Sequence, residues 1–208
     1  QAQDSSFKII ECLYNLKDYS GLKDGLRAYL KLYSKDTAHA PYLYFYMAEA
    51  DYYLTNFQEA IDEYSKVITS SGDERIQGLS KLGIGWAYLK LKRYKESGDT
   101  FSEIKTDNLD KKNRDILLLG KATLSLETKS FTEAGNLYGE LANTTLDQVI
   151  LIQAYLGKAD AYYNTAEYKK AISVYEEALN KTSESASQEN VDKLHYGLAW
   201  AFLKEGEF

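Results

Sequence analysis

Apolar and small residues recur along the chain with a helical spacing, in a pattern that repeats. The clearest copy runs from Leu156 to Leu179 and contains two apolar stripes separated by a polar break at Asn164–Glu167. Within each stripe the apolar side chains recur every three or four residues, which places them on one helix face. The stretch therefore predicts two amphipathic helices joined by a tight turn.

Aromatic residues mark the start of each expected second helix, and they recur at steps of 38, 37, 37, 37 and 40 residues. They are Tyr19, Phe57, Tyr94, Phe131, Tyr168 and Phe208. Nine positions earlier lies Ile10 in the first unit and a small residue in the others, namely Ala48, Gly85, Ala122, Ala159 and Ala199. Small side chains there let a neighbouring helix approach closely. Internal repeats of this length are typical of helical solenoids.

These columns divide the chain into helical pairs that form a single array over residues 1–208. Pro41 stands where one first helix should begin, a position that tolerates a residue without an N–H group. The last unit contains only one helix, which would leave an apolar face uncovered. We therefore expect the chain to be a fragment of a protein that continues beyond Phe208. The units lie at about 4–35, 39–71, 74–106, 110–143, 146–181 and 191–208.

Composition agrees with an all-helical protein and argues against several functions. The 208 residues include one proline and 19 tyrosines, and their Leu, Ala, Lys and Glu content favours helix over sheet. The net charge of −6 argues against a nucleic-acid partner, which needs a basic surface. Since no run of eighteen apolar residues occurs, the sequence also predicts no membrane insertion.

The repeated columns resemble the tetratricopeptide repeat (TPR) family, and the resemblance covers nearly the whole chain. Two features depart from the family pattern: the period is 37 residues rather than 34, and the closing proline is missing from every unit. The resemblance implies an all-α fold, a right-handed superhelical solenoid of helix-turn-helix repeats. The fullest match comprises Tyr155, Ala159, Ala161, Tyr162, Tyr168, Ala171, Tyr175 and Ala178.

The resemblance also implies where a partner would bind, because first helices line the concave face of such a solenoid. Aromatic and acidic residues at the groove positions predict a site for a peptide with apolar anchors and a basic flank. The same aromatic side chains can instead serve only to pack helix against helix. The candidate partner-binding residues are Phe45, Glu49, Tyr52, Tyr53, Leu82, Trp86, Lys90, Asp160, Tyr163, Tyr196 and Trp200.

The family's best-known peptide mode is not expected here. It clamps a C-terminal carboxylate with Lys, Asn and Arg side chains on adjacent first helices. This chain has Phe45, Glu49, Leu82 and Trp86 at the matching positions, so the cationic donors are missing.

No motif indicates catalysis, a cofactor or a metal. The Gly83–Ala87 stretch superficially resembles a dinucleotide fingerprint, but no strand precedes it and it lies within a helical pattern. Neither His39 nor His195 has a suitably spaced His or Cys partner for metal binding. Cys12 is the single cysteine, which we expect to be a small core residue. The sequence therefore predicts a protein that is not an enzyme.

The leading hypothesis is a non-catalytic scaffold that binds a protein or peptide partner, for example in the assembly of a larger complex. One alternative is self-association through the open end or through exposed aromatics such as Tyr42 and Tyr46. Another is the interaction domain of a larger bacterial cell-envelope protein. The sequence does not identify the partner, and it leaves the compartment open between the cytoplasm and the bacterial periplasm or cell envelope.

Overall fold

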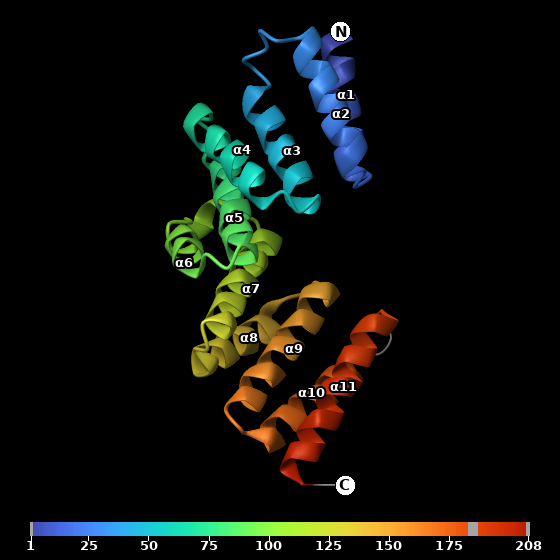
Figure 1. Cartoon of the computed structure of the whole chain (residues 1–208), viewed down its shortest axis with the longest axis vertical. Helices are drawn as coiled ribbons and strands as arrows, with labels where there is room; N and C mark the ends of the chain where they lie inside the picture. Colours follow the sequence, from blue (N-terminus) through green and yellow to red (C-terminus); the bar gives the residue numbers. More distant parts are fainter. Residues whose placement is uncertain (1, 183–186, 207–208) are drawn as a thin grey trace. The chain divides into compact units, whose positions relative to one another are not determined.

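The computed structural model describes residues 2–182 and 187–206, and every regular element in these ranges is a helix (Figure 1). Its internal contacts divide the chain into two compact units, Gln1–Leu109 and Asp110–Phe208. Each unit is built from helices that pair as hairpins and stack in chain order. The predicted all-α fold of helix-turn-helix repeats is confirmed.

The first unit contains three helical pairs and a short 3-10 helix. Consecutive α-helices pack against each other, and α3 also packs against α5. One buried cluster surrounds Ile10, Leu22 and Leu26, and a second surrounds Ala48 and Tyr64. The elements are α1 (Ala2–Asn15), α2 (Tyr19–Leu32), α3 (Ala40–Tyr53), α4 (Phe57–Ser70), α5 (Glu74–Lys90), α6 (Tyr94–Ser102) and η1 (Thr106–Asn108).

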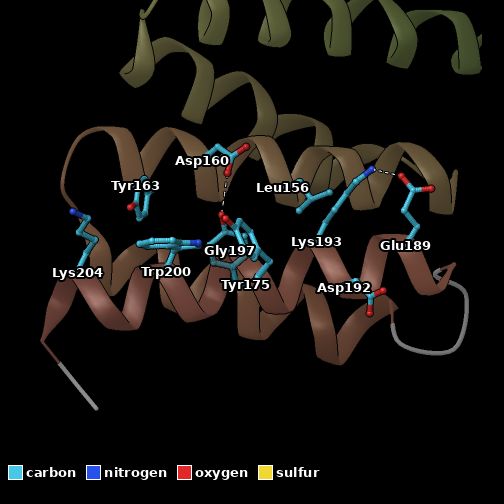
Figure 2. A pocket seen from close by; sticks show the side chains of 11 residues that line it. Leu156, Asp160, Tyr163, Tyr175, Glu189, Asp192, Lys193, Gly197, Trp200 and Lys204 are labelled. Carbon is cyan, nitrogen blue, oxygen red and sulfur yellow. Dashed lines mark hydrogen bonds and ion pairs between the residues drawn. The ribbon is translucent and has the colours of Figure 1, made fainter.

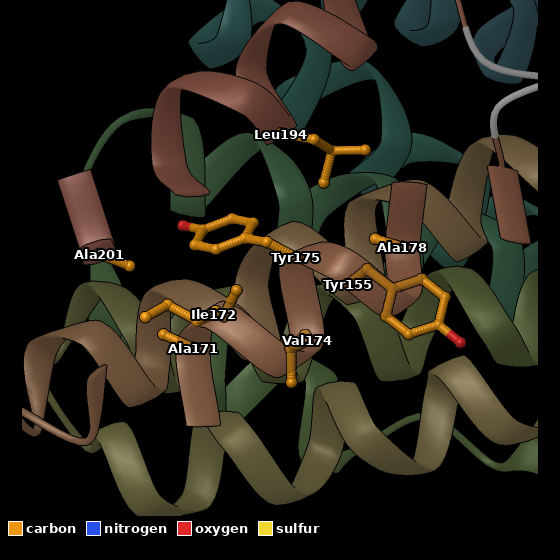
Figure 3. Close-up of a cluster of buried hydrophobic side chains, with 9 residues drawn as sticks. Tyr155, Ala171, Ile172, Val174, Tyr175, Ala178, Leu194 and Ala201 are labelled. Carbon is orange, nitrogen blue, oxygen red and sulfur yellow. The ribbon is translucent and has the colours of Figure 1, made fainter. Parts of the chain in front are cut away.

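The second unit contains two pairs and one further helix. Consecutive helices again pack together, and α9 also contacts both α7 and α11. Figure 3 shows its core, in which Tyr155 and Tyr175 lie among small and branched side chains such as Ala171, Ala178 and Leu194. The elements are α7 (Lys111–Glu127), α8 (Phe131–Thr144), α9 (Gln148–Asn164), α10 (Tyr168–Thr182) and α11 (Gln188–Glu205).

Side-chain caps fix where most first helices begin. Asp73, Asp110, Asp147 and Ser187 accept hydrogen bonds from first-turn N–H groups of α5, α7, α9 and α11. These bonds satisfy donors that have no partner within the helix. Helix α3 starts differently, because Pro41 lies in its first turn, as the sequence predicts.

The turn that follows each first helix contains one residue in the left-handed backbone region. In five turns this residue is not glycine, and its φ lies between 58° and 66°. These residues are Lys17, Thr55, Lys92, Lys129 and Ala166. The matching residue after α11 is Gly206, with a φ of 83°. The predicted turn at Asn164–Glu167 follows this geometry.

Aromatic rings of second helices press directly on glycines of the next first helix. Tyr64 lies on Gly83, Tyr138 on Gly157 and Tyr175 on Gly197; a Cβ atom added to any of these glycines would lie under 3.0 Å from the ring. Only glycine leaves room for this contact. The repeated aromatic residues are therefore core residues that set the distance between successive helices.

One prediction about the core is wrong, because Cys12 is exposed. In α3, α5, α9 and α11 the matching residue is at most 1% exposed, because each of these helices packs on the helix before it. The matching Leu124 of α7 is half-buried. Within the described residues no helix precedes α1, so the face that carries Cys12 has no cover. The matching buried residues are Ala50, Ala87, Ala161 and Ala201.

Part of the C-terminal region lies outside the described residues. This holds for Phe208 and for residues 183–186 of the long polar connection. On α11 itself, Ala199 is exposed, whereas the matching Ala159 of α9 is fully buried against α10. The small-residue column thus fulfils its expected packing role in α9 but not in α11.

Candidate functional site

A pairing of residues fifteen positions apart recurs in four helical hairpins and positions the candidate site. The first-helix member stands at a position that the sequence predicts to face a groove, and the second-helix member is a buried aromatic residue. Hydrogen bonds join three of the pairs. In the fourth pair the two ring centroids lie 6.2 Å apart, with an interplanar angle of 76°. The pairs are Glu49–Tyr64, Trp86–Phe101, Thr123–Tyr138 and Asp160–Tyr175.

Glu49 is the most enclosed carboxylate among these pairs. It accepts hydrogen bonds from the hydroxyl of Tyr64 and, at 3.1 Å, from that of Tyr14. Loss of hydration raises the pKa of Glu49, although both hydrogen bonds act in the opposite direction. Burial and the nearby carboxylate also raise the pKa of Tyr14 and Tyr64. The site thus contains a carboxyl group whose charged form is disfavoured.

The remaining candidates of the first unit divide into packed and exposed side chains. Leu82 is buried, and Phe45 and Tyr52 pack against the core cluster around Tyr64. These three side chains therefore serve helix packing. By contrast, Tyr53 is 54% exposed.

The exposed ring of Tyr53 has a defined position. It stacks on Tyr19, with centroids 4.3 Å apart and an interplanar angle of 10°. Lys90 at the end of α5 is exposed. Trp86 is half-buried, and its indole Nε1 is buried without a hydrogen-bond partner among the described residues.

The four candidates of the second unit come together in one cleft between α9 and α11. Its volume is about 940 Å³, and Tyr175 of α10 contributes to its wall. Figure 2 shows Asp160 and Tyr163 on α9 facing Trp200 on α11. Tyr196 is 68% exposed and Trp200 is 41% exposed, so both rings are accessible to a partner.

The cleft contains charges of both signs. The hydroxyl of Tyr175 donates a hydrogen bond of 2.9 Å to Asp160 Oδ1. Partial enclosure raises the pKa of Asp160, and this hydrogen bond acts in the opposite direction. Lys193 is paired with Glu189, with Nζ and Oε1 2.6 Å apart. Lys204 lines the end of the cleft near Trp200.

Sequence reasoning missed part of this cleft. Tyr175 was expected only as a core residue, and Lys193, Glu189 and Asp192 were not among the candidates. The fifteen-residue offset between Asp160 and Tyr175 was available in the sequence and predicts their contact once two antiparallel helices are assumed. The charged residues of α11 give no such signal, because solvated helix faces have the same composition.

The two histidines and the remaining candidate aromatic residues differ in how far they are enclosed. His39 is linked through Nδ1 to Asp36 at 2.7 Å, and His195 is exposed on α11. Tyr46 is half-buried, with its ring 4.9 Å from that of Tyr14, while Tyr42 is 42% exposed. Among residues 2–182 and 187–206, no group of three or more His, Cys, Asp or Glu side chains could hold a metal ion.

The described helices also include none that is long and apolar enough to cross a membrane.

Comparison with known proteins identifies the repeat. Residues 153–185 match the tetratricopeptide repeat family, which confirms the resemblance inferred from the sequence. No curated protein matches the chain by sequence.

Solved structures match the chain over nearly its whole length. A TPR protein from Parabacteroides merdae has 12% identity and a TM-score of 0.70, with 100% of this chain and 75% of that chain covered. PilF of Pseudomonas aeruginosa has 18% identity and a TM-score of 0.68, with coverages of 98% and 90%. A thermophilic TPR protein from Thermus thermophilus has 14% identity and a TM-score of 0.65, with coverages of 97% and 99%. At these identities the likeness establishes the fold.

Proposed function

We propose that this tetratricopeptide repeat chain is a non-catalytic scaffold that binds a protein or peptide partner through the faces of its first helices. The observation that carries the proposal is the cleft between α9 and α11. It brings Asp160, Tyr163, Tyr196 and Trp200 together, and two of these aromatic rings are exposed. Large rings in a mostly apolar cleft with a few polar groups are typical of surfaces that gain affinity by burying an apolar side chain of a partner.

The first helices of the first unit offer further aromatic side chains for a partner. The exposed Tyr53 is held in place by Tyr19, so the ring can bind without first being ordered. Trp86, on the following first helix, is half-buried, so part of its indole ring remains accessible.

Site-specific photocrosslinking tests the scaffold proposal. A photoreactive phenylalanine analogue replaces Trp200 or Tyr196 in the cleft and, as a matched control in the same unit, the 88% exposed Leu146. We expect discrete adducts with another protein from the cleft positions in source cells, and none from position 146. Identical adducts at all three positions, or adducts only with the chain itself, would overturn the proposal.

A second candidate function is self-association through α1. Ile9 is 59% exposed, and Cys12 is exposed on the same face of α1. Leu16, in the turn directly after α1, is 76% exposed. In α3, α5, α9 and α11 the matching face is covered by the preceding helix, so a second copy could supply that cover for α1. Sedimentation of the chain with Ile9→Asp and Leu16→Asp tests this candidate.

We expect the wild-type chain to show a concentration-dependent mass that the double variant loses. A wild-type monomer at high concentration would exclude self-association.

A further inference from the structure

Asp160 carries a negative charge that packing at its position does not require. The buried hydroxyl of Tyr175 needs an acceptor there, but in the preceding hairpin the neutral Thr123 accepts the equivalent bond from Tyr138 at 3.0 Å. The Trp86–Phe101 pair fills the same position with no hydrogen bond between its members. Asp160 is itself exposed, so its charge is accessible from the cleft that it lines and is not needed to hold Tyr175 in place.

The surroundings of Asp160 leave the charge without a cation. Tyr175 occupies Oδ1, and no Lys, Arg or His side chain in the described part of the chain forms an ion pair with this carboxylate. A carboxylate can accept about four hydrogen bonds, so most of its capacity is available.

The other charged groups of the cleft are mostly satisfied. Lys193 is paired with Glu189, and Asp192 accepts a bond of 2.8 Å from Gln188. The remaining cation is Lys204, which lines the cleft beyond Trp200 in Figure 2. Its position at the end of the cleft leaves the space between Asp160 and Trp200 open to a cation from outside.

Aromatic rings surround that space. Tyr163 extends from α9, and Tyr196 and Trp200 extend from α11, with the last two ring centroids 6.1 Å apart at 70°. Aromatic faces attract cations, Trp most strongly, and a planar guanidinium can stack on a ring while its N–H groups bind a carboxylate. A lysine ammonium lacks this second, planar mode of contact.

We infer that the cleft between α9 and α11 binds an arginine side chain of a partner protein, with the guanidinium stacked on Trp200 and hydrogen-bonded to Asp160. The inference rests on the proposed scaffold function and specifies the chemistry of the partner. The bound group of the partner would be a cation, whereas the carboxylate clamp considered in the sequence analysis binds an anion. Tyr163 and Tyr196 would enclose the aliphatic part of the arginine.

Peptide titration of the whole chain tests this inference. The background carries Trp86→Phe, which leaves Trp200 as the single tryptophan reporter. The probes are the capped peptide Leu-Ala-Arg-Ala-Leu and its counterpart with citrulline, which has nearly the same shape but no charge. We expect the arginine peptide to change Trp200 fluorescence and to bind at least about tenfold more tightly than the citrulline peptide.

Two carboxylate variants locate the effect. Asp160→Asn keeps an acceptor for Tyr175 and should fold normally, which thermal unfolding checks, but it should abolish the preference for arginine. Glu189→Gln removes a carboxylate already paired with Lys193 and should keep most of that preference. Equal losses in both variants would indicate general attraction by an acidic surface and overturn the role of Asp160.

The outcomes separate the inference from the scaffold function. Equal affinity for both peptides, or binding of neither, overturns the arginine site. If crosslinking from position 200 nevertheless yields a discrete partner, the scaffold proposal stands with a different ligand chemistry. If the arginine preference appears and crosslinking gives no partner, the arginine site stands and the scaffold proposal fails.

Discussion

At the residue scale, the left-handed turn positions are the clearest departure from local conformational preference. A side chain with a Cβ atom is disfavoured there by about 1 kcal/mol relative to glycine. Five turns nonetheless contain Lys, Thr or Ala, and only the sixth contains glycine. The packing of each helical pair must therefore hold these turns in place.

Replacing Ala166 with glycine should raise the free energy of unfolding by about 1 kcal/mol, because the residue has a φ of 59° and is exposed. Urea denaturation measures the change. The matched control is Ala28→Gly on the exposed face of α2, which should lower the free energy of unfolding by about 1 kcal/mol. Destabilisation by both substitutions would contradict the role assigned to backbone strain.

Glu49 gives the fold a pH dependence with a defined sign. Because enclosure raises its pKa in the folded state, the folded protein holds this proton more tightly than the unfolded chain does. Its contribution to stability is therefore greatest below the usual glutamate pKa and is lost as the pH rises through the raised value.

Glu49→Gln removes this titration while its amide can still bond to Tyr14 and Tyr64. We expect the variant to gain stability relative to wild type at pH 7.5 and to gain less at pH 4, as measured by thermal unfolding. Glu140→Gln on an exposed position of α8 controls for the change in net charge. An equal gain at both pH values would be incompatible with this account of Glu49.

At the element scale, contacts between glycines and aromatic rings fix how closely successive helices approach. Gly157→Ala should cost about 2 kcal/mol or more, because the new methyl group would overlap the ring of Tyr138. Gly139→Ala, in α8, places its methyl group 3.8 Å from Lys158 Cε, the nearest atom. It should raise the free energy of unfolding by up to about 1 kcal/mol. Chemical denaturation of both variants checks the contrast.

The sequence was most informative about the elements and least informative about what they expose. The aromatic and small columns located the helical pairs and the turn before Tyr168, because period and spacing are local properties. They left open whether Leu82 packs between helices or faces a partner, and they did not predict that Cys12 is exposed. Burial depends on which neighbouring helix is present, and α1 and α5 differ in that respect.

The sequence predicted the first-helix residues of the candidate site but not the charged residues beside them. First-helix positions identified Asp160, Tyr163, Tyr196 and Trp200, which share one cleft. The charges of α11 that complete the lining could not be distinguished in sequence from an ordinary solvated helix face. Their importance follows only from the packing of α11 beside α9.

At the scale of the whole molecule, each compact unit has its own buried clusters. Stability in stacked repeats is largely a sum of local terms. Ile152→Ala, which removes a side chain that is 2% exposed, should cost about 2–5 kcal/mol. Hydrogen exchange should then accelerate in α8, α9 and α10 and stay unchanged in α2, α3 and α4.

The reciprocal substitution Leu26→Ala, at a fully buried position of the first unit, should produce the opposite pattern. Equal acceleration throughout the chain after either change would show instead that the two units unfold as one cooperative body.

The fifteen-residue pairing also affects how this chain can change over generations. In the four hairpins described above, an acid, a hydroxyl or an indole occupies the first-helix position, while the second-helix member is a buried Tyr or Phe. The first-helix residue of each of these pairs can therefore change with little risk to folding. A family built on this arrangement could acquire new binding specificities by single substitutions, without prior stabilising mutations.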